Sequence, residues 1–245
     1  MESTFKKKQS FRDISPREYM YFPKGTLEMG KPGQISKLEL KHISISMIVM
    51  IISFTFALSQ NSLVWSLING GISYDRIFQG FLFSLLGIFS AFFFHELSHK
   101  LMAQYYGLWS EFRMYPKALM ISLVLSITTG FAFAAPGAVM FRGEPRVFEE
   151  GKIAMAGPLA NIFLAGVFLP VFLFTFFQEL GLIAKGLGFI CLINTIFALF
   201  NVLPFGPLDG VNIVKWSKFV WISLIIISSC LFLILLQFIP QIIGN

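Results

Sequence analysis

The sequence predicts an all-α polytopic membrane protein with about five transmembrane helices and one hairpin that re-enters the membrane. The 245-residue chain is 56% hydrophobic and only 13% charged, whereas ordinary soluble domains carry about 25% charged residues. One globular core could not bury that much apolar surface, because surface-to-volume scaling leaves too much of it facing water. The hydrophobic residues also gather in six long runs, as membrane segments do.

A helix needs about 20 apolar residues to cross a bilayer, and this length defines the six apolar segments. A polar stretch precedes them, which predicts two parts: a basic N-terminal tail, 1–41, and a transmembrane domain, 42–245. Pro and Gly residues in the tail argue against one long helix there. The six apolar segments are 42–60, 77–106, 118–140, 152–177, 182–204 and 218–239.

The third segment, 118–140, is predicted to re-enter the membrane instead of crossing it. Gly130, Pro136 and Gly137 suit a break in this segment better than one uninterrupted helix. With a cytoplasmic N-terminus, the hairpin places 17 Lys and Arg residues inside and 2 outside, whereas a full crossing gives 13 and 6. The positive-inside rule therefore favours the hairpin. Its irregular backbone must be covered by protein or line a wet cavity.

The net charge of +6 comes largely from the tail, which holds 9 of the 19 Lys and Arg residues, interspersed with acidic ones. This distribution is typical of a topology-setting segment beside a membrane and not of a surface that binds nucleic acid. We therefore expect the lipid bilayer, and no nucleic acid, as a partner. The expected location is the cell membrane, with the N-terminus in the cytoplasm.

His95, Glu96 and His99 form an HExxH motif near the end of the second apolar segment. Histidines four residues apart project from one face of a helix and can hold one metal ion, and the Glu between them can take a proton from bound water. Residues 77–94, just before the motif, contain no charged side chain. Ionisable groups at membrane depth are costly, so the motif indicates a functional site.

A zinc site needs at least a third protein ligand, and Asp209 is the candidate. It stands at the cytoplasmic end of the fifth segment in the hairpin topology, at a depth similar to that of His95 and His99. Asp209-Gly210 is also a common turn pair, so spacing alone leaves a ligand and a turn equally open.

Three segments resemble, in the same order along the chain, the motifs of the site-2 protease family of intramembrane zinc proteases. The helix 94–100 looks like that family's HExxH helix, 156–161 looks like its Gly-Pro-x-x-Asn segment, and 201–210 looks like its Asn-x-x-Pro…Leu-Asp-Gly motif. The resemblance covers roughly residues 40–215. The run 134–139 is similar to the region where the family holds an extended substrate, so the hairpin can include short β-strands.

The resemblance implies a zinc-dependent intramembrane endopeptidase with one Zn²⁺ per chain and transmembrane proteins as its substrates. For Asn161, in the second motif, we expect a structural bond to a neighbouring backbone group. The implied roles are metal ligation by His95, His99 and Asp209, proton transfer by Glu96 and oxyanion stabilisation by Asn201.

Two alternatives stay open at this point. A CAAX-processing-type membrane zinc protease also uses HExxH but takes a downstream Glu as third ligand, and Glu149-Glu150 is the candidate pair. That pair falls in a charged connecting segment, which favours Asp209. A metal transporter, or a non-catalytic metal-binding membrane protein, would bind metal without needing Glu96. The sequence shows no inverted repeats of half-helices, which are typical of many transporters.

Overall fold

The computed structural model describes residues 35–69, 71–134 and 136–243. Within them, five helical spans are long and apolar enough to cross a membrane, which confirms the predicted all-α polytopic fold. The expectation for the tail falls almost wholly on residues 1–34, outside the described residues. The five spans are Lys37–Ile68, Tyr74–Tyr105, Val147–Phe177, Gly181–Asn201 and Lys218–Leu236.

The first helix, α1 (Lys37–Ser59), begins before the expected boundary at residue 42. The Ser36 hydroxyl accepts a hydrogen bond from the Glu39 backbone N–H at 3.0 Å. This contact satisfies one of the free N–H groups in the first turn and so fixes the helix start. Three charged residues assigned to the tail are therefore helical, and Glu39 among them is fully buried.

The second span is not a uniform α-helix. It consists of α3 (Tyr74–Ile88), a π-helical turn η2 (Phe89–Phe93) and α4 (Phe94–Tyr105). Single π turns inside α-helices are rare, and those that do occur are often found at functional sites. Here the π turn comes directly before the HExxH motif.

The predicted hairpin is present and includes two short strands. The helix α5 (Pro116–Thr129) is too short to cross a bilayer, and Gly130, with φ +81°, ends it. The chain then returns to form β2 (Gly137–Arg142), which pairs antiparallel with β1 (Trp109–Met114). The register pairs the last residue of β1 with the first residue of β2. Both ends of the segment therefore meet at one sheet, as a hairpin requires.

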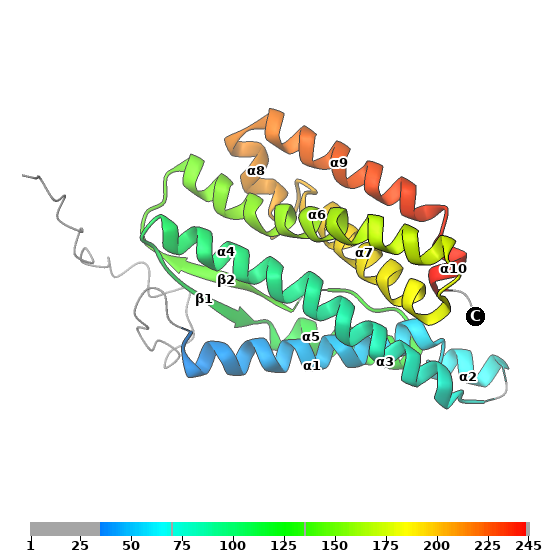
Figure 1. Ribbon diagram of the computed structural model, residues 1–245. Coiled ribbons are helices and arrows are strands. Elements are labelled where there is room, and N and C mark those ends of the chain that lie inside the picture. Colours follow the sequence, from blue (N-terminus) through cyan, green and yellow to red (C-terminus); the bar gives the residue numbers. More distant parts are fainter. Residues whose placement is uncertain (1–34, 70, 135, 244–245) are drawn as a thin grey trace, which may run out of the picture.

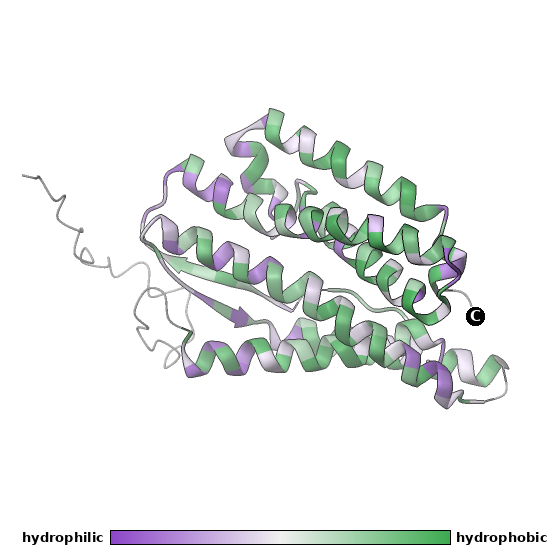
Figure 2. Cartoon of the chain, in the orientation of Figure 1, coloured by the Kyte–Doolittle hydropathy of each residue, from purple (hydrophilic) through white to green (hydrophobic). Residues whose placement is uncertain are grey.

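The remaining elements complete a helical bundle. Figure 1 shows the strands beside α1 and α4 at one end of the molecule, with the later helices packed on the other side of α4. Hydrophobic residues cover most of the length of the helices in Figure 2, and hydrophilic ones gather toward their ends. The helices not yet named are α2 (Leu63–Asn69), α6 (Val147–Phe177), α7 (Gly181–Asn201), α8 (Gly210–Trp216), α9 (Lys218–Leu236) and α10 (Ile239–Ile243).

Candidate metal centre

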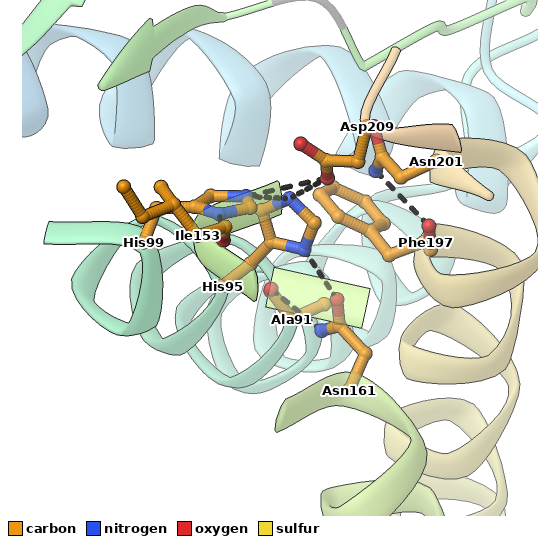
Figure 3. A network of polar contacts seen from close by, with 8 residues as sticks. All are labelled: Ala91, His95, His99, Ile153, Asn161, Phe197, Asn201 and Asp209. Carbon is orange, nitrogen blue, oxygen red and sulfur yellow. Dashed lines mark hydrogen bonds and ion pairs between the residues drawn. The ribbon is translucent and has the colours of Figure 1, made fainter. Parts of the chain in front are cut away.

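The structure brings the two histidines of α4 together with Asp209, from the loop before α8 (Figure 3). The two Nε2 atoms of His95 and His99 lie 3.0 Å apart, and each lies 3.3 Å from Asp209 Oδ2. Both histidines are buried. Tetrahedral zinc with bonds of about 2.0–2.2 Å holds its ligand atoms about 3.3 Å apart. The spacing of the three atoms therefore fits a zinc ion.

The hydrogen bonds on the far side of each imidazole set its tautomer. His95 Nδ1 lies 2.6 Å from Asn161 Oδ1, and His99 Nδ1 lies 2.7 Å from the Ile153 carbonyl oxygen. Both oxygens can only accept, so each neutral imidazole carries its proton on Nδ1. The two Nε2 lone pairs then converge with a carboxylate oxygen that accepts no hydrogen bond among the described residues. Three atoms that present lone pairs to one point are the ligands that a cation needs.

Asp209 is held in place by the loop between α7 and α8. A Cβ on Gly210 would lie 2.1 Å from the Val202 carbonyl oxygen, so only glycine lets the start of α8 approach the end of α7 this closely. Asp209 Oδ2 lies 3.3 Å from both histidine Nε2 atoms, so its side chain faces the point where the two lone pairs converge. A carboxylate is the form of Asp that ligates metals.

Glu96 lies beside these three residues and faces the sheet. Its carboxylate contacts the backbone of Val139 in β2, and its Oε2 is buried without a hydrogen-bond partner among the described residues. A cavity of about 20 Å³ adjoins it, lined by Leu97, Lys100 and Phe112 among others. A cavity of that volume has room for one water molecule. Glu96 thus has one buried carboxylate oxygen that no described residue engages.

The two asparagines singled out in the sequence both lie at the site. Asn201 ends α7 beside Asp209 (Figure 3), and its Nδ2 donates to the Phe197 carbonyl at 3.0 Å. Asn161 donates from Nδ2 to the Ala91 carbonyl at 2.8 Å, which confirms the expected bond to a neighbouring backbone group. Asn161 also bonds His95, one of the candidate metal ligands, through its Oδ1, and this bond was not predicted.

The alternative third ligand lies elsewhere. Glu149 is in the first turn of α6, where its Oε2 accepts a hydrogen bond from the Arg146 backbone N–H at 2.7 Å. This bond caps the helix. Within the described ranges, His95, His99 and Asp209 form the one group of side chains close enough to share a metal ion.

Gly157 also belongs to the site, although the sequence motifs gave it no role. A Cβ there would lie 2.3 Å from His99 Nε2 and 2.7 Å from His95 Cε1. We expect Gly157→Ala to push both imidazoles apart and to weaken zinc binding at least about tenfold, because small displacements around metal ligands cost that much. Competition with a fluorescent zinc chelator measures the affinity.

Gly166→Ala provides the matched control for this variant. Gly166 lies on the same helix, and a Cβ there would meet no atom within 4 Å. Gly166→Ala should bind zinc as the wild type does. Equal affinities for the two variants would contradict the close packing of α6 beneath the histidines.

Comparison with known proteins gives two relatives. A protein of Methanocaldococcus jannaschii named "Putative zinc metalloprotease" is 41% identical over 143 residues, which are 58% of this chain and 73% of that protein. A protein of Bacillus subtilis with the same description is 34% identical over 104 residues, which are 38% of this chain and 46% of that protein. No family model matches the chain, and no solved structure matches it.

Proposed function

The chain belongs to a family of zinc metalloproteases, and from this premise we propose that it is an intramembrane endopeptidase. It would hydrolyse peptide bonds within or near the transmembrane segments of other membrane proteins, as the resemblance to the site-2 protease family implies. The observation that carries the proposal is the convergence of three buried acceptor atoms beside Glu96. Two of these atoms belong to a helix that is long and apolar enough to span a membrane.

The side chains suggest a division of labour. Zinc held by His95, His99 and Asp209 would supply Lewis-acid activation of a water molecule and of the substrate carbonyl. Glu96 accepts the proton of the attacking water and then gives it to the leaving amine nitrogen. Asn201 uses one amide hydrogen on the Phe197 carbonyl, and its second amide hydrogen is available to the developing oxyanion.

The edge of β2 is the proposed place where an extended substrate binds. The Tyr115 N–H donates to the Pro136 carbonyl. In an antiparallel pair, successive residues of a strand point their backbone N–H and C=O alternately toward and away from the partner strand, so Pro136 and every second residue after it face β1. Val139 is three residues beyond Pro136, so its backbone N–H and C=O point away from β1, toward Glu96. A substrate strand added along this edge would bring its own backbone next to the catalytic Glu. A helical substrate must unwind first, and Gly or Pro in it should ease that step.

We further propose that the protein works in the cell membrane with its N-terminus in the cytoplasm, one zinc ion per chain and no nucleic-acid partner. The charge distribution supports this orientation, because it places the connecting segments with most Lys and Arg residues inside. The metal centre then lies toward the cytoplasmic ends of α4 and α7, from which water can reach it.

The test of this function compares Asp209→Ala with Glu150→Ala in liposomes that contain a tagged membrane-spanning substrate. We expect wild-type cleavage to stop on chelation and to return with Zn²⁺. Asp209→Ala should retain little zinc and lose cleavage, because two histidines alone do not complete the site.

Glu150→Ala serves as the control and should retain both zinc and cleavage. Glu150 is the remaining candidate for a CAAX-type third ligand, since Glu149 caps α6. Full zinc content and activity in Asp209→Ala, with loss of both in Glu150→Ala, would overturn the ligand set in favour of the CAAX-type enzyme. Failure of the wild type to cleave the substrate under any zinc concentration would count against proteolysis.

A further inference from the structure

A chain of buried hydrogen bonds runs from the metal ligand His95 into α7. Asn161, on α6, donates from its Nδ2 to Asn194 Oδ1 at 3.0 Å. Asn194, on α7, donates from its own Nδ2 to the Ile190 carbonyl and to Ser90 Oγ, both at 2.9 Å. Asn161 and Asn194 are both 0% exposed. No motif in the sequence includes Asn194 or Ser90.

The direction of every bond in this chain follows from two backbone carbonyls. The Ile190 carbonyl can only accept, so it holds the Nδ2 end of Asn194 and turns Oδ1 toward Asn161. The Ala91 carbonyl likewise holds the Nδ2 end of Asn161. Asn161 Oδ1 is thereby left for His95 Nδ1. The proton of His95 is kept on Nδ1, and Nε2 presents its lone pair to the metal.

The π turn is part of the same arrangement. Ala91 and Ser90 both lie in η2, and each is bonded by one of the two asparagines. Ser90 Oγ also donates to the Gly87 carbonyl at 2.9 Å, which orients its lone pairs toward Asn194. The asparagines therefore connect α6 and α7 to the turn that precedes the metal ligands.

We propose that Asn194 is a positioning residue that sets the tautomer of His95 through Asn161 and so tunes the affinity for zinc. The proposal rests on the zinc site of the proposed function. Asn194 touches neither metal nor substrate. It acts because Asn161 has two amide hydrogens to place, and Asn194 supplies the second acceptor that keeps its amide from turning over.

The test measures zinc affinity by chelator competition for Asn194→Leu, Ser90→Ala and Thr195→Val. Asn194→Leu keeps the volume but removes the acceptor. We expect a loss of up to about tenfold, because direct partners of metal ligands are worth about 10- to 100-fold and Asn194 acts one bond further away. Ser90→Ala removes one more remote neutral bond, and we expect a loss of about fivefold. Thr195→Val is the matched control, because Thr195 is buried next to Asn194 and its hydroxyl donates within its own helix, to the Cys191 carbonyl.

A second measurement separates positioning from a general loss of structure. In the metal-free protein, ¹⁵N chemical shifts of the imidazoles should show His95 protonated on Nδ1 in the wild type and mixed tautomers in Asn194→Leu, with His99 unchanged. Wild-type affinity in a folded Asn194→Leu would overturn the proposal. If that variant does not fold, wild-type affinity in Ser90→Ala would overturn it. Absence of zinc binding in the wild type would instead refute the proposed function.

Discussion

Glu96→Gln should abolish cleavage while leaving the metal in place. The substitution keeps the size of the side chain and an oxygen that can face the backbone of Val139, but it removes the group that accepts the proton of the attacking water. General acid–base catalysis contributes roughly 10²- to 10⁴-fold. Because Glu96 would serve both proton transfers, we expect kcat to fall about 10³-fold or more with zinc stoichiometry unchanged.

The measurement uses the purified protein in liposomes with a tagged membrane-spanning substrate, alongside metal analysis of each preparation. Glu144→Gln is the control, because Glu144 is an exposed residue in the loop before α6. Retained cleavage by Glu96→Gln would show that Glu96 is not the group that transfers the protons. Zinc flux into the liposomes without any cleavage, equal in wild type and Glu96→Gln, would support a transporter instead.

The sequence was sufficient for the spans and the hairpin because both depend on quantities that add along the chain. Apolar length identifies a span wherever it occurs, and the Lys and Arg asymmetry decided that 118–140 returns to the side it left. The His95–His99 pair was equally accessible, since helical spacing alone puts both on one face. Asp209 needed the family resemblance, because Asp-Gly also fits a turn.

The partners of these residues could not be predicted, because they come from helices far apart in the sequence. Asn194 lies 33 residues from Asn161 and 104 from Ser90. An asparagine in the middle of an apolar segment was the available signal, since polar groups at membrane depth need partners. That signal does not say which partner, and the π turn that receives the bonds leaves no recognisable pattern.

Glu39 was assigned to the polar tail from its position before the first apolar segment. Lys100 directly follows the HExxH motif. The structure buries both, with Lys100 4% and Glu39 0% exposed, and pairs them across 61 residues. The two charges face each other between α1 and α4, so neither is a solvated end.

Glu39→Ala should therefore destabilise the protein by about 3–5 kcal/mol, because removing one partner of a buried ion pair costs about that much. Glu39 Oε2 pairs with Lys100 Nζ, and its Oε1 accepts a hydrogen bond from the Phe112 backbone N–H at 3.0 Å. Ser110 Oγ donates to the Lys100 carbonyl at 3.2 Å. One carboxylate thus joins α1, α4 and β1, and denaturant titration in detergent measures its contribution.

The double variant Glu39→Ala/Lys100→Met distinguishes a buried ion pair from ordinary packing. Replacing both residues removes the ion pair as a whole, and the remaining cost includes the Phe112 N–H without its acceptor, about 1–3 kcal/mol. Lys41→Ala, at an exposed position on the same helix, should change stability little. If the double variant is as unstable as Glu39→Ala, the charge of Lys100 is not the cause. Glu39 bonds β1, β1 pairs with β2, and Val139 of β2 contacts Glu96. We therefore also expect Glu39→Ala to slow cleavage at temperatures where the protein remains folded.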